Sequence, residues 1–180
     1  MTTDPQTDMQ ETAIPLLVTG IDLDNEATLD VIGAQFDNLT WHSEAGQIIA
    51  TLHTTSGDPI ADALEIARMV VVMLPGARVS GVDPQLVALS DIADRLAISS
   101  EAVRLWAAGK RRAGTPFPAP AGRVSTGRTV MKIWSWPAVL TWLRQEFHLD
   151  PEPDICYLSE QDSHTLAIRL SGLDLTAVAS

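Results

Sequence analysis

The sequence predicts an α+β protein made of two small domains and a C-terminal helix. Its 180 residues are enough for one ordinary domain or two small ones. Residues 14–82 alternate between β-rich runs and apolar residues at helical spacing, and four of the five tryptophans fall between residues 106 and 142. Because large aromatic side chains bury the most area per residue, this concentration of tryptophan predicts a separate small core.

The N-terminal domain is expected over residues 14–82, after a flexible polar tail at residues 1–13. Its first helix should begin after a cap at Asp24, and its second after Asp58-Pro59, because Pro suits the first helical position. The strands are expected at residues 14–23, 38–43, 47–53 and 77–82. The resulting order β-α-β-β-α-β is that of a ferredoxin-like split βαβ unit.

The charge of the chain is unevenly distributed. The net charge is −11, and residues 1–88 contain thirteen acidic and only two basic residues. Residues 89–146 instead contain nine basic and four acidic residues, whereas residues 147–180 are acidic again. Since salt screens exposed charges over about 8 Å at physiological ionic strength, a basic face can attract an anionic partner although the whole chain is acidic.

Residues 90–106 have the pattern of two short helices joined by a tight turn. Ser90 is expected to cap the first helix and Ser99 the second, while Val103 and Trp106 pack the second helix against the first. The residues left exposed on the second helix would be Ser100, Glu101, Arg104, Leu105 and Ala108. This pattern predicts a helix-turn-helix whose second helix, residues 99–108, presents its N-terminal half to the major groove of DNA.

The same segment resembles the helix-turn-helix of the MerR-like and excisionase-like winged-helix families. It also resembles small actinobacterial regulators in the runs I-A-x-R-L at residues 92–96 and V-R-x-W at residues 103–106. The resemblance covers residues 87–146 and implies a winged helix-turn-helix DNA-binding domain over residues 83–149. These families usually carry Gly in the turn, where this chain has Ala97. A left-handed backbone there would cost a non-Gly residue about 1 kcal/mol.

Basic residues follow the second helix and flank a predicted hairpin. Gly109 is a natural end for the helix, and three cations come directly after it. Two β-rich arms surround a Ser125-Thr126-Gly127 tip, as a wing requires. The expected DNA-binding residues are Ser99, Ser100, Glu101, Arg104, Leu105, Lys110, Arg111, Arg112, Arg123, Arg128 and Lys132.

Two of these assignments have open alternatives. Residues 110–112 would also complement the dipole at the end of the helix. Glu101 would either support the N-terminus of its helix or accept a hydrogen bond from a cytosine.

The C-terminal part is expected to begin with a closing helix after Ser135-Trp136-Pro137. Residues 150–180 read as a linker, over residues 150–158, and a last helix over residues 159–170. Ser159 and Asp162 form a capping-box pattern at the start of this last helix. Its partner surface is left open.

No motif of an enzyme or of a cofactor site is present. The four histidines lack ligand spacing, and there is neither a nucleophile motif nor a phosphate-binding glycine loop. The cluster Asp22, Asp24, Glu26 and Asp30 fits a solvated acidic surface better than a metal site. A single Cys156 favours a reducing cytoplasm, and the longest apolar run, residues 69–74, is far below the roughly 20 residues of a membrane span.

The function expected from the sequence is therefore sequence-specific binding of double-stranded DNA by a cytoplasmic transcriptional regulator. One helix-turn-helix reads few base pairs, so a homodimer is expected. The N-terminal domain would supply the dimer contact or sense a small-molecule or protein effector. Two alternatives remain: an adaptor whose acidic N-terminal domain docks a partner, and an excisionase-like factor that bends DNA.

Overall fold

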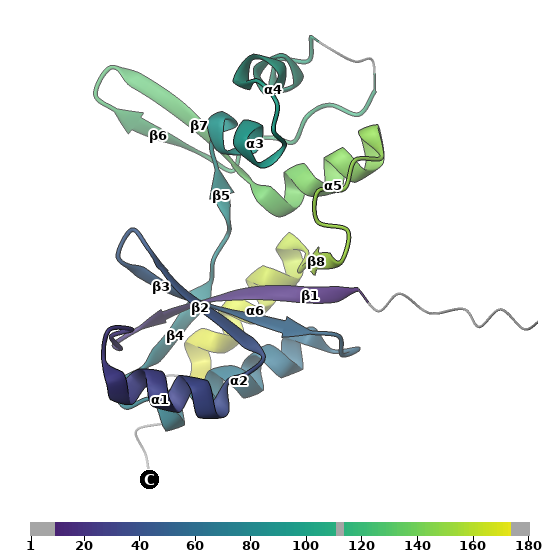
Figure 1. Ribbon diagram of the computed structural model, residues 1–180. Helices are drawn as coiled ribbons and strands as arrows, with labels where there is room; N and C mark the ends of the chain where they lie inside the picture. Colours follow the sequence, from purple (N-terminus) through teal and green to yellow (C-terminus); the bar gives the residue numbers. More distant parts are fainter. Residues whose placement is uncertain (1–9, 111–113, 174–180) are drawn as a thin grey trace, which may run out of the picture. The chain divides into compact units, whose positions relative to one another are not determined.

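The chain folds into two compact units, which Figure 1 shows as ribbons. The computed structural model describes residues 10–110 and 114–173. Unit 1 consists of Met1–Asp83 with Asp154–Ser180, and unit 2 consists of Pro84–Pro153. Unit 2 is thus inserted between two segments of unit 1. Within the described ranges, no helix has the length and apolar character that crossing a bilayer would require.

Unit 1 contains a mixed sheet in which β1 occupies the centre. Its strands are β1 (Glu11–Thr19), β2 (Leu39–Glu44), β3 (Gln47–Thr54), β4 (Arg78–Val82) and β8 (Ile155–Tyr157). The order β2-β3-β1-β4 is antiparallel throughout, and β8 pairs with β1 in parallel. Because β3 occupies one edge of β1, β4 and β8 share the other: β4 pairs with residues 16–19 and β8 with residues 11–13.

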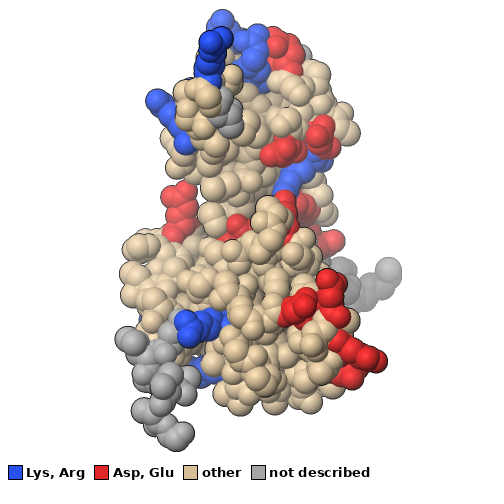
Figure 2. Space-filling model, turned by 90° about the vertical axis from the view of Figure 1, so that its left-hand side faces the viewer, with Lys and Arg blue, Asp and Glu red and all other residues tan. Residues whose placement is uncertain are grey.

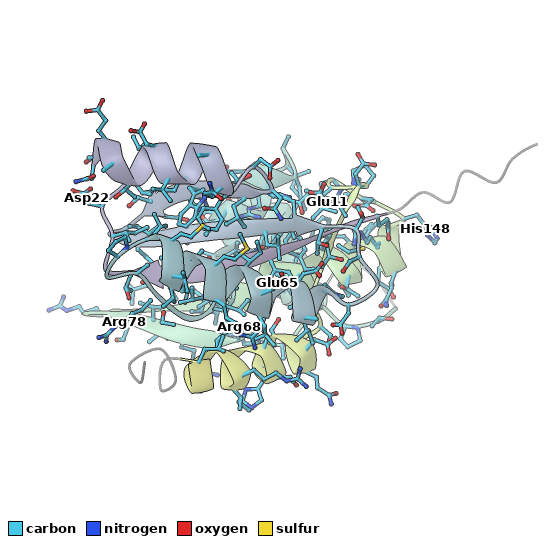
Figure 3. All side chains as sticks on the ribbon, turned by 90° about the horizontal axis from the view of Figure 1, so that it is seen from below. Glu11, Asp22, Glu65, Arg68, Arg78 and His148 are labelled. Atoms are coloured by element: carbon cyan, nitrogen blue, oxygen red, sulfur yellow. The ribbon has the colours of Figure 1, made fainter. Side chains whose placement is uncertain are left out.

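Three helices cover one face of this sheet (Figures 1 and 3): α1 (Glu26–Gln35), α2 (Pro59–Met73) and α6 (Glu160–Leu173). Figure 3 looks onto this helical layer, with Glu65 and Arg68 labelled on α2. One apolar core joins the alternate residues Ile14, Leu16 and Val18 of β1 to helix residues that include Leu166 and Leu170 of α6. The C-terminal helix therefore completes the core of unit 1. The surface on which it packs, which the sequence left open, is the apolar core of this unit.

Several boundaries in unit 1 differ from the sequence prediction. Strand β1 begins at Glu11 instead of residue 14, and residues 1–9 of the expected tail lie outside the described residues. The cap of α1 is Asn25 instead of Asp24, because the Asn25 side chain accepts the hydrogen bond from the Thr28 amide. The prediction of a linker over residues 150–158 is wrong for residues 155–157, because their backbone pairs with β1.

Two other local predictions in unit 1 are confirmed. Asp58 caps α2 by accepting a hydrogen bond from the Ala61 amide at 3.0 Å. Ser159 accepts one from the Asp162 amide at 3.1 Å and donates to the Asp162 carboxylate at 2.7 Å, in front of α6. Both depend on contacts within four residues, which a sequence pattern can reveal.

Unit 2 combines three helices with a three-stranded antiparallel sheet of order β5-β7-β6. Its elements are β5 (Leu86–Val87), α3 (Leu89–Arg95), α4 (Ser100–Ala107), β6 (Gly122–Thr126), β7 (Thr129–Ser135) and α5 (Trp136–Phe147). Strands β6 and β7 form a hairpin around Gly127, whose positive φ of 63° suits a tight turn. The predicted hairpin is confirmed.

Aromatic side chains form the centre of unit 2, as the clustering of tryptophan predicts. The ring of Trp142 on α5 lies 5.6 Å from that of Trp106 on α4 and 4.9 Å from that of Phe117. Phe117 also packs edge-on against Trp134 of β7, with 5.9 Å between ring centroids. The indole N–H of Trp142 donates to the Thr115 carbonyl at 3.0 Å, so this buried polar group is satisfied.

Loss of α6 packing should destabilise unit 1. Leu166 has no exposed surface, so Leu166→Ala should lower the free energy of unfolding by about 2–5 kcal/mol through lost burial and a residual cavity. Ile168 on the same helix is 59% exposed, and Ile168→Ala should change it by less than about 0.5 kcal/mol. Urea unfolding followed by circular dichroism measures both. Equal effects of the two substitutions would mean that α6 is not part of the core.

Candidate nucleic-acid interface

Helices α3 and α4 pack together in unit 2, and α3 begins differently from the sequence prediction. The predicted cap at Ser90 is wrong, because α3 already starts at Leu89. The Asp91 carboxylate instead accepts a hydrogen bond from the Ala88 amide at 2.7 Å and satisfies the free N–H in front of the helix. Ile92 and Ala93 are buried and form the inner face of α3.

The turn between α3 and α4 depends on Ala97, which has a positive φ of 51°. The next amide, that of Ile98, donates to the Ala93 carbonyl at 3.0 Å and closes the turn. Ser99 then caps α4, as predicted, by accepting a hydrogen bond from the Ala102 amide at 3.2 Å. The left-handed backbone at a residue with a Cβ atom leaves about 1 kcal/mol of strain in this turn.

Helix α4 presents a polar face and buries an apolar one. Val103 is fully buried, and the predicted outer residues Ser99, Ser100, Glu101 and Arg104 are exposed. Leu105 is half-buried, whereas the sequence predicts that it lies exposed on the outer face. Its carbonyl accepts a hydrogen bond from the Lys110 amide at 2.9 Å.

The C-terminal end of α4 is closed by Gly109, as the sequence predicts. Gly109 adopts a positive φ of 68°. A Cβ atom would be strained there, whereas Gly adopts this conformation readily. Lys110, which follows, is exposed.

Glu101 and Arg104 form a bidentate ion pair on the exposed face of α4. The Nε atom of Arg104 donates to Oε2 of Glu101 at 2.7 Å, and its Nη2 atom donates to Oε1 at 2.6 Å. The hydrogen bonds from Arg104 hold the pKa of Glu101 below its ordinary value, and those to Glu101 raise the pKa of Arg104. The pair is therefore fully ionised at neutral pH and is lost only as the pH falls through the lowered pKa of Glu101.

The hairpin carries three of the predicted cations, and all three are exposed. Arg123 of β6 lies directly opposite Lys132 of β7, so two positive side chains share one face of the hairpin. Arg128 follows Gly127 in the connecting turn. Among the described residues, none of these three cations forms an ion pair. Like charges directly opposite each other destabilise strand pairing, and a bound anion would remove this repulsion.

Two other cations of unit 2 serve its own structure. Arg95 stacks on the ring of Trp136, with its guanidinium carbon 4.6 Å from the ring centroid. Arg144 donates to both carboxylate oxygens of Asp150, at 2.8 and 3.0 Å, and to the Glu152 carbonyl at 2.8 Å. Sequence spacing could not separate these two from the other cations, since their partners are set by the tertiary fold.

The other cations that the structure describes in unit 2 lie on α4, directly after it, or on the β6–β7 hairpin. Figure 1 shows α4 and the β6–β7 hairpin at one end of unit 2, with α5 beneath them, and Figure 2 shows Lys and Arg side chains clustered over it. We call this the basic end of unit 2. Its described cations are Arg104, Lys110, Arg123, Arg128 and Lys132. Arg111 and Arg112, which the sequence also predicts as DNA contacts, lie outside the described residues.

No family model, curated protein or solved structure matches this chain. Among the residues that the structure describes, no group of three or more His, Cys, Asp or Glu side chains is arranged to hold a metal ion.

Relief of the strain at Ala97 should stabilise unit 2. Ala97→Gly should raise its free energy of unfolding by about 1 kcal/mol, because Gly adopts the left-handed backbone without a steric penalty. Ala102→Gly makes the same change inside α4 and should lower the free energy of unfolding by about 1 kcal/mol. Urea unfolding followed by tryptophan fluorescence reports on unit 2, which contains four of the five tryptophans. The same sign for both substitutions would contradict a left-handed turn.

Proposed function

We propose that this chain binds double-stranded DNA and acts as a transcriptional regulator of the winged helix-turn-helix type. In this assignment α3 and α4 are the helix-turn-helix, α4 is the recognition helix, and the β6–β7 hairpin is the wing. The observation that carries the proposal is the set of exposed cations without an ion pair among the described residues: Lys110 after α4, and Arg123, Arg128 and Lys132 on the hairpin. Phosphate groups are the partner that this set fits best, because DNA presents one negative charge per roughly 1.7 Å of helix axis.

The dimensions and the polarity of α4 support the same assignment. With its side chains, an α-helix such as α4 has a diameter of about 10–12 Å. A B-DNA major groove of about 12 Å width admits such a helix. Ser99, Ser100 and Glu101 at its N-terminal end are exposed and can face base edges, as the first residues of recognition helices do.

The hairpin supports phosphate binding in a second way. The pairing of Arg123 with Lys132 is unfavourable for the isolated hairpin. DNA would convert this repulsion into two favourable contacts, because phosphates surround both edges of a groove. The apolar packing of Trp134 anchors β7 to the aromatic core, so the hairpin can extend while its base stays in place.

Unit 1 is assigned to dimerisation or to effector sensing in this proposal. Its strand order β2-β3-β1-β4, with helices after β1 and β3, supports the assignment of unit 1 as a ferredoxin-like split βαβ unit. A homodimer would place two recognition helices on successive turns of the duplex and so read a longer site. The acidic unit 1 would also weaken nonspecific attraction to polyanions in the cytoplasm.

Salt dependence of DNA binding tests the proposal. The affinity of the full chain for random duplex DNA should fall with salt at a log–log slope of about −0.9 per phosphate contacted. The triple variant Arg123→Ala, Arg128→Ala, Lys132→Ala should bind more weakly and should lose about 0.9 of slope for each contact removed. Fluorescence anisotropy at a series of salt concentrations measures both quantities.

A matched control removes positive charge from unit 1 instead. Arg68 of α2 and Arg169 of α6 are exposed, and the double variant Arg68→Ala, Arg169→Ala should keep the slope of the natural chain. If the full chain fails to bind duplex DNA, or if the triple variant keeps an unchanged slope, the basic end is not a phosphate-binding surface. An adaptor role for the acidic unit 1 would then be the better explanation.

A further inference from the structure

The Glu101–Arg104 pair leaves a defined set of donors free on α4. A guanidinium group has five N–H donors in a rigid planar fork. Glu101 occupies the Nε–H and one N–H of Nη2, so both N–H groups of Nη1 and one of Nη2 remain. The edge formed by Nη1 and Nη2 still offers two parallel donors. A guanine in the major groove presents two acceptors, O6 and N7, at the matching spacing.

The pairing also makes Arg104 a poor phosphate contact. The carboxylate of Glu101 cancels the charge of the guanidinium and would repel a nearby phosphate. Both side chains are about 60% exposed, and an ion pair this exposed contributes little to the stability of the fold. Its bidentate geometry favours one orientation of the guanidinium, which reduces the conformational freedom that binding would otherwise remove.

We infer that Arg104, oriented by Glu101, reads a guanine in the major groove and sets the sequence preference of the site. This inference rests on the proposed function. Arg104 is the specificity-determining residue, and Glu101 is a positioning residue that acts through it. The lysines of the basic end, Lys110 and Lys132, act on the DNA backbone, since an ammonium group is a point charge without a planar fork.

Glu101 reading a cytosine directly is the competing assignment. Each of its carboxylate oxygens already accepts a hydrogen bond from Arg104, at 2.6 and 2.7 Å. This engagement favours a positioning role over direct contact with a base. The two assignments differ in which substitution abolishes the preference at a given base pair.

Selection from a randomised duplex library tests the inference with the full chain. The natural chain should select sites with a guanine at one fixed position of each half-site. Arg104→Ala should lose the preference at this position and keep it elsewhere, whereas Lys132→Ala should weaken binding uniformly and keep the whole preference. If Arg104→Ala kept the preference for guanine at this position, the inference would be overturned.

Atomic substitution in the DNA sharpens the test. Replacement of the selected guanine by 7-deazaguanine removes the N7 acceptor and should weaken binding of the natural chain about tenfold or more. The same replacement should not affect Arg104→Ala. Equal losses for both proteins, or no loss for either, would exclude a contact between Arg104 and N7.

The positioning role of Glu101 predicts two opposite effects of Glu101→Gln. Discrimination against a mismatched base pair should fall, because the guanidinium is no longer held by a carboxylate. Affinity for random DNA should rise, because one negative charge is removed from the basic end. If Glu101 had a merely structural role, Glu101→Gln would lower both the discrimination and the affinity for random DNA. If Glu101 read a cytosine directly, Glu101→Gln would lose the preference at a different base pair from the one that Arg104→Ala affects.

The outcomes separate this inference from the proposed function. If the natural chain does not bind duplex DNA in a salt-dependent manner, the proposed function is wrong. If it binds in that manner but Arg104→Ala selects the same sites, DNA binding stands and the assignment of Arg104 is wrong. Circular dichroism of each variant shows whether α4 remains folded.

Discussion

The structure of unit 2 depends on the tilted and edge-to-face packing of its aromatic side chains. A segment of roughly 70 residues has little interior to fill, so a few large rings must supply most of its buried area. The ring of Trp142 on α5 contacts those of Trp106 on α4 and of Phe117, and Phe117 in turn contacts Trp134 of β7. In each pair the ring centroids are less than 6 Å apart. One core therefore positions α4 and the base of the hairpin together. The relative placement of the polar face of α4 and the exposed cations follows from this packing.

The cations of unit 2 then divide by what they contact. Arg95 and Arg144 stabilise the unit through an aromatic ring and a carboxylate. Arg104 is paired on the surface, where an ion pair contributes little to stability. Arg123 and Lys132 face each other without a counter-charge among the described residues. The net charge of residues 89–146 therefore overstates the number of cations available to a partner, because some of this charge is already neutralised within the unit.

Several local features of this fold could be predicted from the sequence, although the caps expected at Asp24 and Ser90 are wrong. The contacts that join the two ends of the chain could not be predicted. The caps at Asp58, Ser99 and Ser159 and the turn at Gly109 depend on neighbours within a few residues. The pairing of β8 with β1 and the docking of α6 join the two ends of the chain, and no periodicity records such contacts. Within the candidate site, the exposed residues of α4 were predictable from helical spacing, except that Leu105 is half-buried. The partners of Arg95 and Arg144 were not, since both are decided by tertiary packing.

The hairpin departs from what stability alone would select. Alternation along β6 and β7 places Val130 on the face that carries Arg123 and Lys132, and Val130 is 62% exposed. An isolated strand pair with facing cations and exposed apolar side chains gains little from folding. Its anchor is Trp134, whose ring packs on Phe117 and whose indole N–H donates to the Pro118 carbonyl at 3.1 Å. Proteins break such local rules mainly at functional sites. In the proposed function, a groove edge with phosphates beside an apolar sugar surface would satisfy both the cations and the valine.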